Sequence, residues 1–239
     1  MPDKTEKYVP RAIFSEIASH VIKQPEITMI TGSRQVGKTV LLEQLKNWLI
    51  KQSKIRPAQI VYYNLDLLSD WEMFQSQTAF IEFLKEHSQK FKLFVLVDEA
   101  QRVPEAPIFF KGVYDSRLNV KLVLTGSASL EIKAKLKETL AGRKRIFVLS
   151  PFLFTEFLQA KNQEFLFQAV TNRKKINLLD IKKLLKFYQE YAVYGGYPRV
   201  VFAGKREDKI AILQEIYSSY VEKEAIGFLA IKNRSAFSR

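Results

Sequence analysis

The chain has 239 residues, of which 47% are hydrophobic, which is enough for one α/β domain with a smaller appended region. Its 38 lysines and arginines against 25 aspartates and glutamates give a formal net charge of +13, a balance that can favour an anionic partner. The absence of cysteine excludes disulfides, thiolate metal sites and cysteine nucleophiles.

The sequence contains no apolar run of the length that a transmembrane helix requires. Its polar beginning, MPDKTEKYVPRA, lacks the apolar region of a signal peptide. We therefore expect a cytoplasmic protein without membrane insertion.

Strand and helix patterns alternate through the first two thirds of the chain. Short runs rich in β-branched and apolar residues are separated by segments whose apolar residues recur at helical spacing. We predict strands over 27–31, 60–63, 93–97, 120–124 and 146–149, and helices over 11–22, 41–49, 78–88 and 107–114.

A glycine-rich segment connects the first predicted strand to the next helix. It reads Gly-x-x-x-x-Gly-Lys-Thr, the phosphate-loop pattern of nucleotide-binding proteins. Glycines let backbone N–H groups turn inward around phosphate oxygens, and the following helix adds its N-terminal partial positive charge. Lys38 should reach the β- and γ-phosphates of ATP, and Thr39 should bind Mg²⁺. The expected nucleotide-binding residues are Gly32, Ser33, Arg34, Gln35, Val36, Gly37, Lys38, Thr39 and Val40.

An acidic pair ends the third predicted strand. The continuous apolar run 93–97 is typical of a central parallel strand, and Asp98 and Glu99 follow it at once. Ligands bind beyond the carboxyl ends of strands in open α/β sheets. Asp98 would hold Mg²⁺, through water, and Glu99 would orient or deprotonate the attacking water.

The alternation implies βαβ units and a parallel sheet that is covered on both faces. The predicted fold class is therefore α/β, a P-loop NTPase core with a five-stranded parallel sheet between helices. After Pro151 the patterns are helical only, with amphipathic helices around 181–188 and 210–221. We assign residues 1–160 to the core and residues 161–239 to a smaller, all-helical lid region.

The fourth predicted strand ends in Thr125-Gly126-Ser127. When a glutamate follows the Mg²⁺-binding aspartate, this strand is expected between the phosphate-loop strand and the acidic strand. Its tip then points at the γ-phosphate, where Thr125 or Ser127 would supply a hydroxyl, and Ser127 is our catalytic candidate. Ser127 is equally suited to cap a helix over 130–136.

Two further features are open to more than one interpretation. Arg143 precedes the last strand, where it could stabilise γ-phosphate charge in cis or across a subunit boundary, or belong to a basic surface cluster. Gly195-Gly196-Tyr197-Pro198 is a glycine-rich turn that could simply connect two helices.

The chain resembles the prokaryotic AAA-type ATPases related to the STAND NTPases over nearly its whole length. The matching runs are TGSRQVGKTVLLEQL, LVDEAQ, LTGSASLEIKAKLKETLAGRKRIFVLSPFLFTEFL and YGGYPRVV. The resemblance implies an ATPase core with a helical lid, and it places Pro198 in the family's Gly-x-Pro motif near the nucleotide base. Relatives usually continue into a winged-helix segment and a nuclease-like domain, so the resemblance implies a chain that stops short, at Arg239.

The leading functional hypothesis is an Mg²⁺-dependent ATPase that converts ATP to ADP as a switch, and the acidic pair favours it. The alternatives are a non-hydrolysing nucleotide-gated regulator or DNA-binding module, kept open by the charge, and a small-molecule kinase. Basic groups at 143–145, 173–175 and 182–183 could bind nucleic acid weakly or simply be solvated. Homo-oligomerisation is also left open.

Overall fold

Two units make up the part of the chain that the computed structural model describes, which is residues 8–127 and 140–220. Among these residues, the α/β unit comprises 13–33, 38–127 and 140–149. The helical unit comprises 8–12, 34–37 and 150–220. The helix predicted over 130–136 lies outside the described residues.

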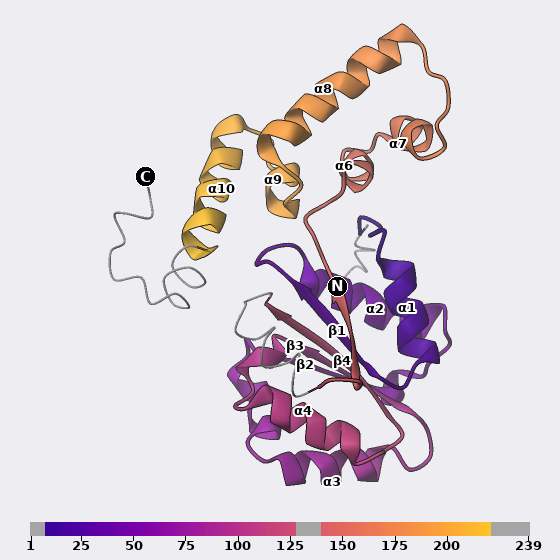
Figure 1. Cartoon of the computed structure of the whole chain (residues 1–239), viewed down its shortest axis with the longest axis vertical. Coiled ribbons are helices and arrows are strands. Elements are labelled where there is room, and N and C mark those ends of the chain that lie inside the picture. Colours follow the sequence, from indigo (N-terminus) through magenta and orange to yellow (C-terminus); the bar gives the residue numbers. More distant parts are fainter. Residues whose placement is uncertain (1–7, 128–139, 221–239) are drawn as a thin grey trace, which may run out of the picture. The chain divides into compact units, whose positions relative to one another are not determined.

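The α/β unit contains a five-stranded sheet in its described residues (Figure 1). Its order is β2-β3-β4-β1-β5 and every neighbouring pair is parallel, which confirms the predicted fold class. Strand β4 lies between β1 and β3, as the motif order predicts. The bounds are β1 (Ile27–Gly32), β2 (Ile60–Asn64), β3 (Leu93–Asp98), β4 (Val120–Ser127) and β5 (Lys144–Val148).

Helices and short 3₁₀ turns connect these strands. Ser76 caps the helix after β2 by accepting a hydrogen bond from the Ala79 N–H, a typical helix start. The helices of this unit are α1 (Phe14–Lys23), α2 (Lys38–Lys51), α3 (Gln77–His87) and α4 (Ala106–Asp115). The turns are η1 (Pro57–Gln59), η2 (Leu68–Asp70), η3 (Glu72–Phe74) and η4 (Ala100–Arg102).

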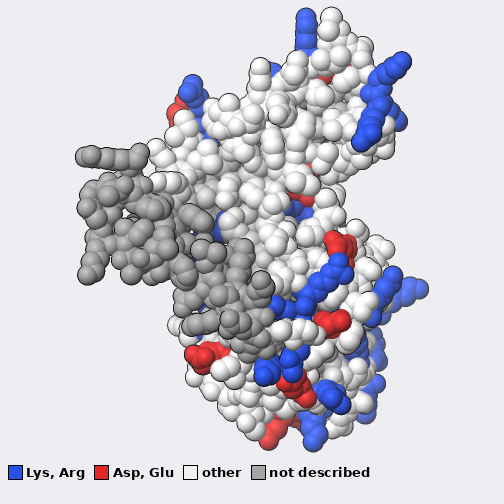
Figure 2. Space-filling view, in the orientation of Figure 1, with Lys and Arg blue, Asp and Glu red and all other residues white. Residues whose placement is uncertain are grey.

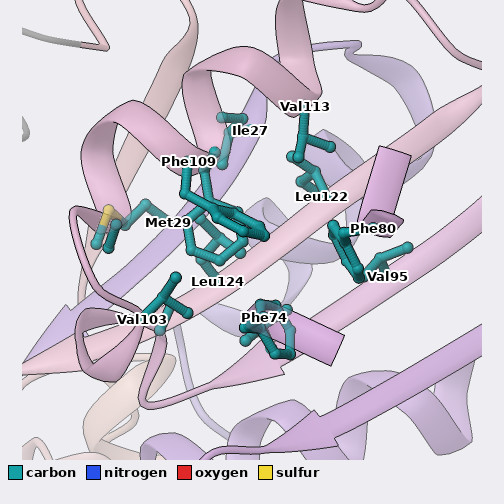
Figure 3. Close-up of a cluster of buried hydrophobic side chains, with 14 of the residues drawn as sticks. Ile27, Met29, Phe74, Phe80, Val95, Val103, Phe109, Val113, Leu122 and Leu124 are labelled. Atoms are coloured by element: carbon teal, nitrogen blue, oxygen red, sulfur yellow. The ribbon is translucent and has the colours of Figure 1, made fainter. Parts of the chain in front are cut away.

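An aromatic cluster covers one face of the sheet (Figure 3). Phe74, Phe80 and Phe109 pack there against alternate residues of the central strands, since every second side chain faces the same side. Every residue of β1 and of β3 is buried, so both faces of the sheet centre are covered. Burying each such ring contributes roughly 1.5–3 kcal/mol. The strand residues in the cluster include Ile27, Met29, Val95, Leu122 and Leu124.

The helical unit has its own core. Phe152, Phe157, Leu158, Leu166 and Val201 form a buried cluster. The segment that begins at Ser150 therefore groups with the helices, earlier in the chain than the boundary expected at residue 160. The helices are α6 (Phe154–Ala160), α7 (Glu164–Thr171), α8 (Leu178–Tyr194), α9 (Pro198–Phe202) and α10 (Arg206–Tyr220). Among the described helices, none combines the length and apolar character needed to cross a membrane.

A lysine is fully buried near the amino end of β4. Lys121 Nζ donates hydrogen bonds to the carbonyl oxygens of Gln24, at 3.0 Å, and Glu26, just after α1 ends. Burial lowers the pKa of Lys121 to about 7, with a smaller contribution from Lys92. The two carbonyls compensate for the desolvated amine, so this side chain fastens the end of α1 to the sheet.

His20 lies in the same buried region and makes the stability sensitive to acid. Its Nδ1 is 2.8 Å from Thr28 Oγ1, and burial, helped by Lys121, lowers its pKa from 6.5 to about 4. The unfolded chain therefore binds the proton more readily between these pH values, and stability falls as the pH drops through that window.

We predict a loss of up to about 3 kcal/mol in the free energy of unfolding between pH 6.5 and 4 from this histidine. His20→Gln should flatten the pH dependence, most clearly above pH 5, measured by urea unfolding at successive pH values. The chain has two histidines, and the exposed His87 provides the control. His87→Gln should leave the dependence unchanged, and an equal slope in wild type and His20→Gln would contradict the prediction.

Candidate functional site

The phosphate loop connects β1 to α2. Gln35 and Gly37 have positive φ angles of 63° and 94°, so the backbone turns through left-handed conformations on the way to the helix. Such alternation directs successive N–H groups toward one side, which is how backbones hold anions. Val36 is fully buried, whereas Val40 in the first turn of α2 is 45% exposed.

Lys38 lies at the first position of α2 and is buried. Its Nζ donates to the carbonyl oxygens of Gly32 and Ser33, both at 3.3 Å, and lies 3.7 Å from Glu99 Oε1. The structure thus brings the loop lysine and the predicted water-activating carboxylate together at the carboxyl edge of the sheet. Thr39 follows Lys38 and is half-buried.

Asp98 ends β3 and is 1% exposed. Its Oδ1 accepts a hydrogen bond from Thr125 Oγ1, and its Oδ2 is buried with no hydrogen-bond partner among the described residues. A buried carboxylate oxygen without a donor fits a bound cation or a water of its hydration shell. Among the described residues, no group of three or more histidine, aspartate and glutamate side chains is arranged to hold a metal ion by itself.

Glu99 has a left-handed backbone, with φ 55° and ψ 42°, which is uncommon outside glycine. Its Oε2 accepts a hydrogen bond from Gln101 Nε2, while its Oε1 faces Lys38. Gln101 is therefore a residue of the site to which sequence reasoning gave no role, although it is the last residue of the LVDEAQ run.

Thr125 is one of the two hydroxyl residues that the sequence left open. It is fully buried, donates to Asp98 and accepts from the Glu99 N–H at 3.0 Å. One hydroxyl thus fixes both members of the acidic pair. The side chain of Ser127, the sequence-based candidate, lies outside what the structure describes, so its role stays a prediction.

Arg143 lies at the opposite edge of the sheet. Its carbonyl oxygen accepts a hydrogen bond from the Ile27 N–H, at the amino end of β1, and its guanidinium pairs with Asp115. Gly32 lies five residues further along β1, about 16 Å away at the usual strand rise. An arginine side chain does not span that distance, so the geometry does not support the role in cis. A role across a subunit boundary stays a prediction.

The GGYP turn joins α8 to α9 in the helical unit. Gly195 has a φ of 73°, and a Cβ on Gly196 would lie 2.1 Å from the Phe152 carbonyl oxygen, so both positions need glycine. Pro198 begins α9, as its fixed φ allows. The interpretation as a helix connection fits this geometry, and a contact of Pro198 with a nucleotide base stays a prediction.

Arg199 is a second polar residue that sequence reasoning missed. It follows Pro198 and donates to the loop side chain of Gln35 at 2.9 Å and to Glu215 at 2.8 Å. Gln35 also donates to Glu215 at 3.2 Å. Hydrogen bonds within the helical unit therefore connect the phosphate-loop residue Gln35 to α9 and α10. No sequence motif indicated this contact between distant segments.

Comparisons with known proteins show which family this chain belongs to. A family model described as an AAA domain matches residues 24–158, more than half of the chain. An uncharacterised protein of Haemophilus influenzae is 32% identical over 197 residues, which cover 82% of this chain and 45% of that protein. An uncharacterised protein of Methanocaldococcus jannaschii is 24% identical over 216 residues, 87% of this chain and 44% of that protein. The chain thus spans about half the length of these curated relatives.

Solved structures share the fold. The Walker-type ATPase of Pyrococcus abyssi superposes with a TM-score of 0.58 at 17% identity, covering 95% of this chain and 77% of that chain. PCH-2 of Caenorhabditis elegans gives 0.52 at 15% identity, covering 87% and 67%. At such identities the likeness concerns the fold alone.

We predict that Thr125→Val lowers the free energy of unfolding by about 1–3 kcal/mol, because it leaves buried groups without a partner. Urea unfolding measures this loss. Thr31→Val is a matched control: Thr31 is also buried, on the neighbouring β1, but its hydroxyl has no hydrogen-bond partner among the described residues. That change should be neutral or stabilising, and equal losses in the two variants would contradict the assignment of Thr125.

Proposed function

We propose that this chain, which belongs to the AAA domain family, binds ATP with Mg²⁺ and hydrolyses it, with the nucleotide state acting as a conformational switch. The observation that carries the proposal is the 3.7 Å approach of Lys38 to Glu99 beside the buried Asp98. A loop amine, a metal-binding carboxylate and a second carboxylate at one sheet edge are what phosphoryl transfer to water requires. The relation to STAND NTPases is part of the proposal.

The loop and the start of α2 would hold the triphosphate. Backbone N–H groups of the loop and the amine of Lys38 neutralise its negative charge. Thr39 and Asp98 would hold Mg²⁺, which supplies charge neutralisation at the phosphates when bound. The buried, unpartnered Oδ2 of Asp98 supports this assignment.

Glu99 would activate the attacking water. Its side chain is 22% exposed, so water can reach it, while Gln101 and the left-handed backbone limit its motion. A γ-phosphate competes with Glu99 for the amine of Lys38, because both are anions close to one ammonium group. Nucleotide binding would in this way free the carboxylate to accept a proton from water.

ATP binding and ADP release by the variants Lys38→Ala and Glu99→Gln test the proposal. Lys38→Ala should abolish tight binding in calorimetry, whereas Lys51→Ala, at the exposed end of the same helix, should not. Glu99→Gln should keep ATP binding and lower the rate of ADP release by about 10²–10⁴.

Glu105→Gln is the control for the carboxylate, because Glu105 is exposed and has a similar backbone, with φ 48°. It should leave turnover unchanged. Wild-type turnover in Glu99→Gln would refute the assignment of the base, and undiminished ATP affinity in Lys38→Ala would refute the site itself.

The alternative function, a nucleotide-gated DNA-binding module, draws support from a basic region of the helical unit. Lys and Arg gather where the chain passes from α7 to α8 (Figure 2). The exposed basic residues there are Arg173, Lys174, Lys175, Lys182, Lys183 and Lys186. By contrast, Arg143 and Arg145 in the α/β unit pair with the carboxylates of Asp115 and Glu16.

We predict weak duplex-DNA binding without sequence preference, with the logarithm of affinity falling by about 0.9 per phosphate contacted for each log unit of salt. Fluorescence anisotropy measures it. Replacing Arg173, Lys174 and Lys175 by glutamine should weaken binding. The same change at the exposed Lys51, Lys54 and Arg56 should not. Absence of binding at about 50 mM salt would end this alternative.

A further inference from the structure

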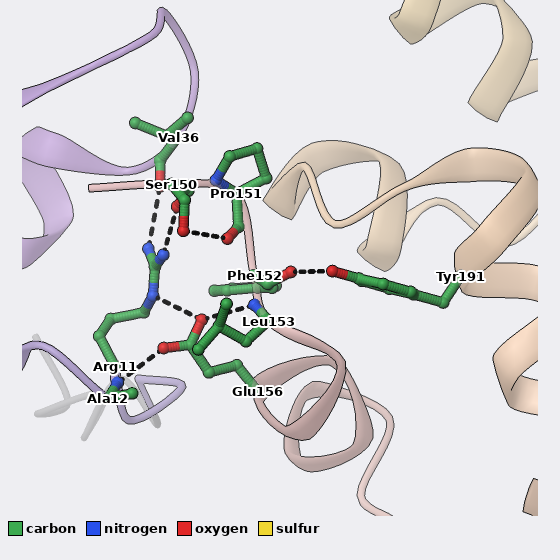
Figure 4. A network of polar contacts seen from close by, with 9 residues as sticks. All are labelled: Arg11, Ala12, Val36, Ser150, Pro151, Phe152, Leu153, Glu156 and Tyr191. Carbon is green, nitrogen blue, oxygen red and sulfur yellow. Dashed lines mark hydrogen bonds and ion pairs between the residues drawn. The ribbon is translucent and has the colours of Figure 1, made fainter. Parts of the chain in front are cut away.

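Arg11 is a buried arginine that contacts both of the other segments of the helical unit, the loop 34–37 and the stretch 150–156 (Figure 4). It is 8% exposed. Its Nη1 donates to the carbonyl oxygen of Val36 in the phosphate loop at 3.0 Å, and its Nη2 donates to that of Ser150 at 2.5 Å. Its guanidinium also lies over the ring of Phe152, 4.9 Å from the ring centre.

Glu156 is the counter-ion of Arg11 and is held as firmly. Its Oε2 lies 3.1 Å from Arg11 Nε and also accepts the Leu153 N–H at 2.9 Å. Its Oε1 accepts the Ala12 N–H at 2.6 Å. Burial lowers the pKa of Arg11 while Glu156 raises it, and an arginine stays charged under such opposing effects.

Stability alone does not explain why the chain buries the ion pair of Arg11 and Glu156. Desolvating two charges costs as much as their attraction returns, and apolar residues of similar size often serve stability equally well. What apolar residues cannot do is donate a hydrogen bond to the Val36 carbonyl. The bond to the phosphate loop is therefore the feature of Arg11 that calls for a functional explanation.

The geometry of the Val36–Gly37 peptide supplies a functional explanation for the bond between Arg11 and the Val36 carbonyl. In a trans peptide the C=O and the following N–H lie in one plane and point in opposite directions. Because Arg11 holds the Val36 carbonyl, the Gly37 N–H points away from the guanidinium. Gly37, which follows this peptide, has a φ of 94°, and because glycine adopts many conformations the peptide could otherwise rotate.

We infer that Arg11 is a positioning residue for the phosphate loop: by holding the Val36 carbonyl, it fixes the Gly37 N–H in the orientation that binds phosphate. Glu156 in turn fixes Arg11. The inference rests on the proposed function, because it assigns a role within the same phosphate-binding loop.

The test compares ATP with inorganic tripolyphosphate, which lacks the adenosine and so reports on the phosphate cradle alone. Arg11→Lys keeps the charge but loses the planar set of donors, and it should weaken both ligands by the same factor, about tenfold. Calorimetry on the full chain measures both affinities, and thermal unfolding without ligand checks the fold.

A double variant separates positioning from folding. Arg11→Met with Glu156→Gln removes both buried charges, so it should unfold within a few degrees of wild type and still lose about tenfold in affinity for both ligands. It also replaces Arg11→Lys as the test if that variant fails to fold. Arg145→Lys is the matched control: Arg145 pairs with Glu16 and lies over Phe147, 5.1 Å from the ring centre, in the α/β unit. It should bind both ligands like wild type.

The outcomes distinguish the two claims. Wild-type affinity for tripolyphosphate in a folded Arg11 variant would overturn the positioning role. If Lys38→Ala still abolishes binding in the same assay, the proposed function survives that result. A loss for ATP but not for tripolyphosphate would also overturn it, because Arg11 would then act on the adenosine. A wild-type chain that binds neither ligand would overturn the proposed function and the inference together.

Discussion

Strand β4 hydrogen-bonds to β1 on one side and to β3 on the other, with Gly32 beside Ser127 and Val97 beside Leu124. Because all neighbouring strands are parallel, their carboxyl ends gather at one edge of the sheet. The phosphate loop, the acidic pair and Thr125 reach one another only through this register. A slip of one residue in β4 would turn Thr125 to the other face and leave Asp98 and Glu99 without their shared hydroxyl.

Two buried lysines, one at each end of the parallel strands, have different sets of partners. Lys121 and Lys38 each donate to two backbone carbonyls, which compensates for the desolvation of an amine. At the amino edge Lys121 ties the end of α1 to the sheet. At the carboxyl edge Lys38 also faces Glu99, and its weak bonds of 3.3 Å leave it able to exchange partners for a phosphate.

In the helical unit, the GGYP turn supports the segment that carries a partner of Arg11. Phe152 N donates to the Gly196 carbonyl at 2.7 Å, and Tyr191 donates to the Phe152 carbonyl at 2.9 Å. Gly196 thus lies close against the backbone of Phe152, and the Ser150 carbonyl two residues earlier accepts from Arg11. The sequence linked this turn to the nucleotide base. In the structure it supports the backbone of Phe152, next to the segment that contacts Arg11.

The sequence by itself determined the fold class, the place of β4 between β1 and β3, and the phosphate-loop pattern. Those features follow from local patterns: a strand, a glycine turn and a helix from 27 to 49, and an apolar run that ends in Asp98-Glu99. Glycine spacing and strand-end carboxylates are local signals, so the sequence could indicate these motifs without long-range information.

Only the tertiary structure decided which distant side chains serve those motifs. Thr125 was one of two hydroxyl candidates in the sequence, and strand pairing brings it onto the acidic pair. Arg143 reads like a phosphate-binding arginine, but parallel pairing places it at the far edge of the sheet. Arg11 meets Glu156 across 145 positions of the chain. Such contacts depend on packing between elements, and the spacing of residues along the chain does not encode it.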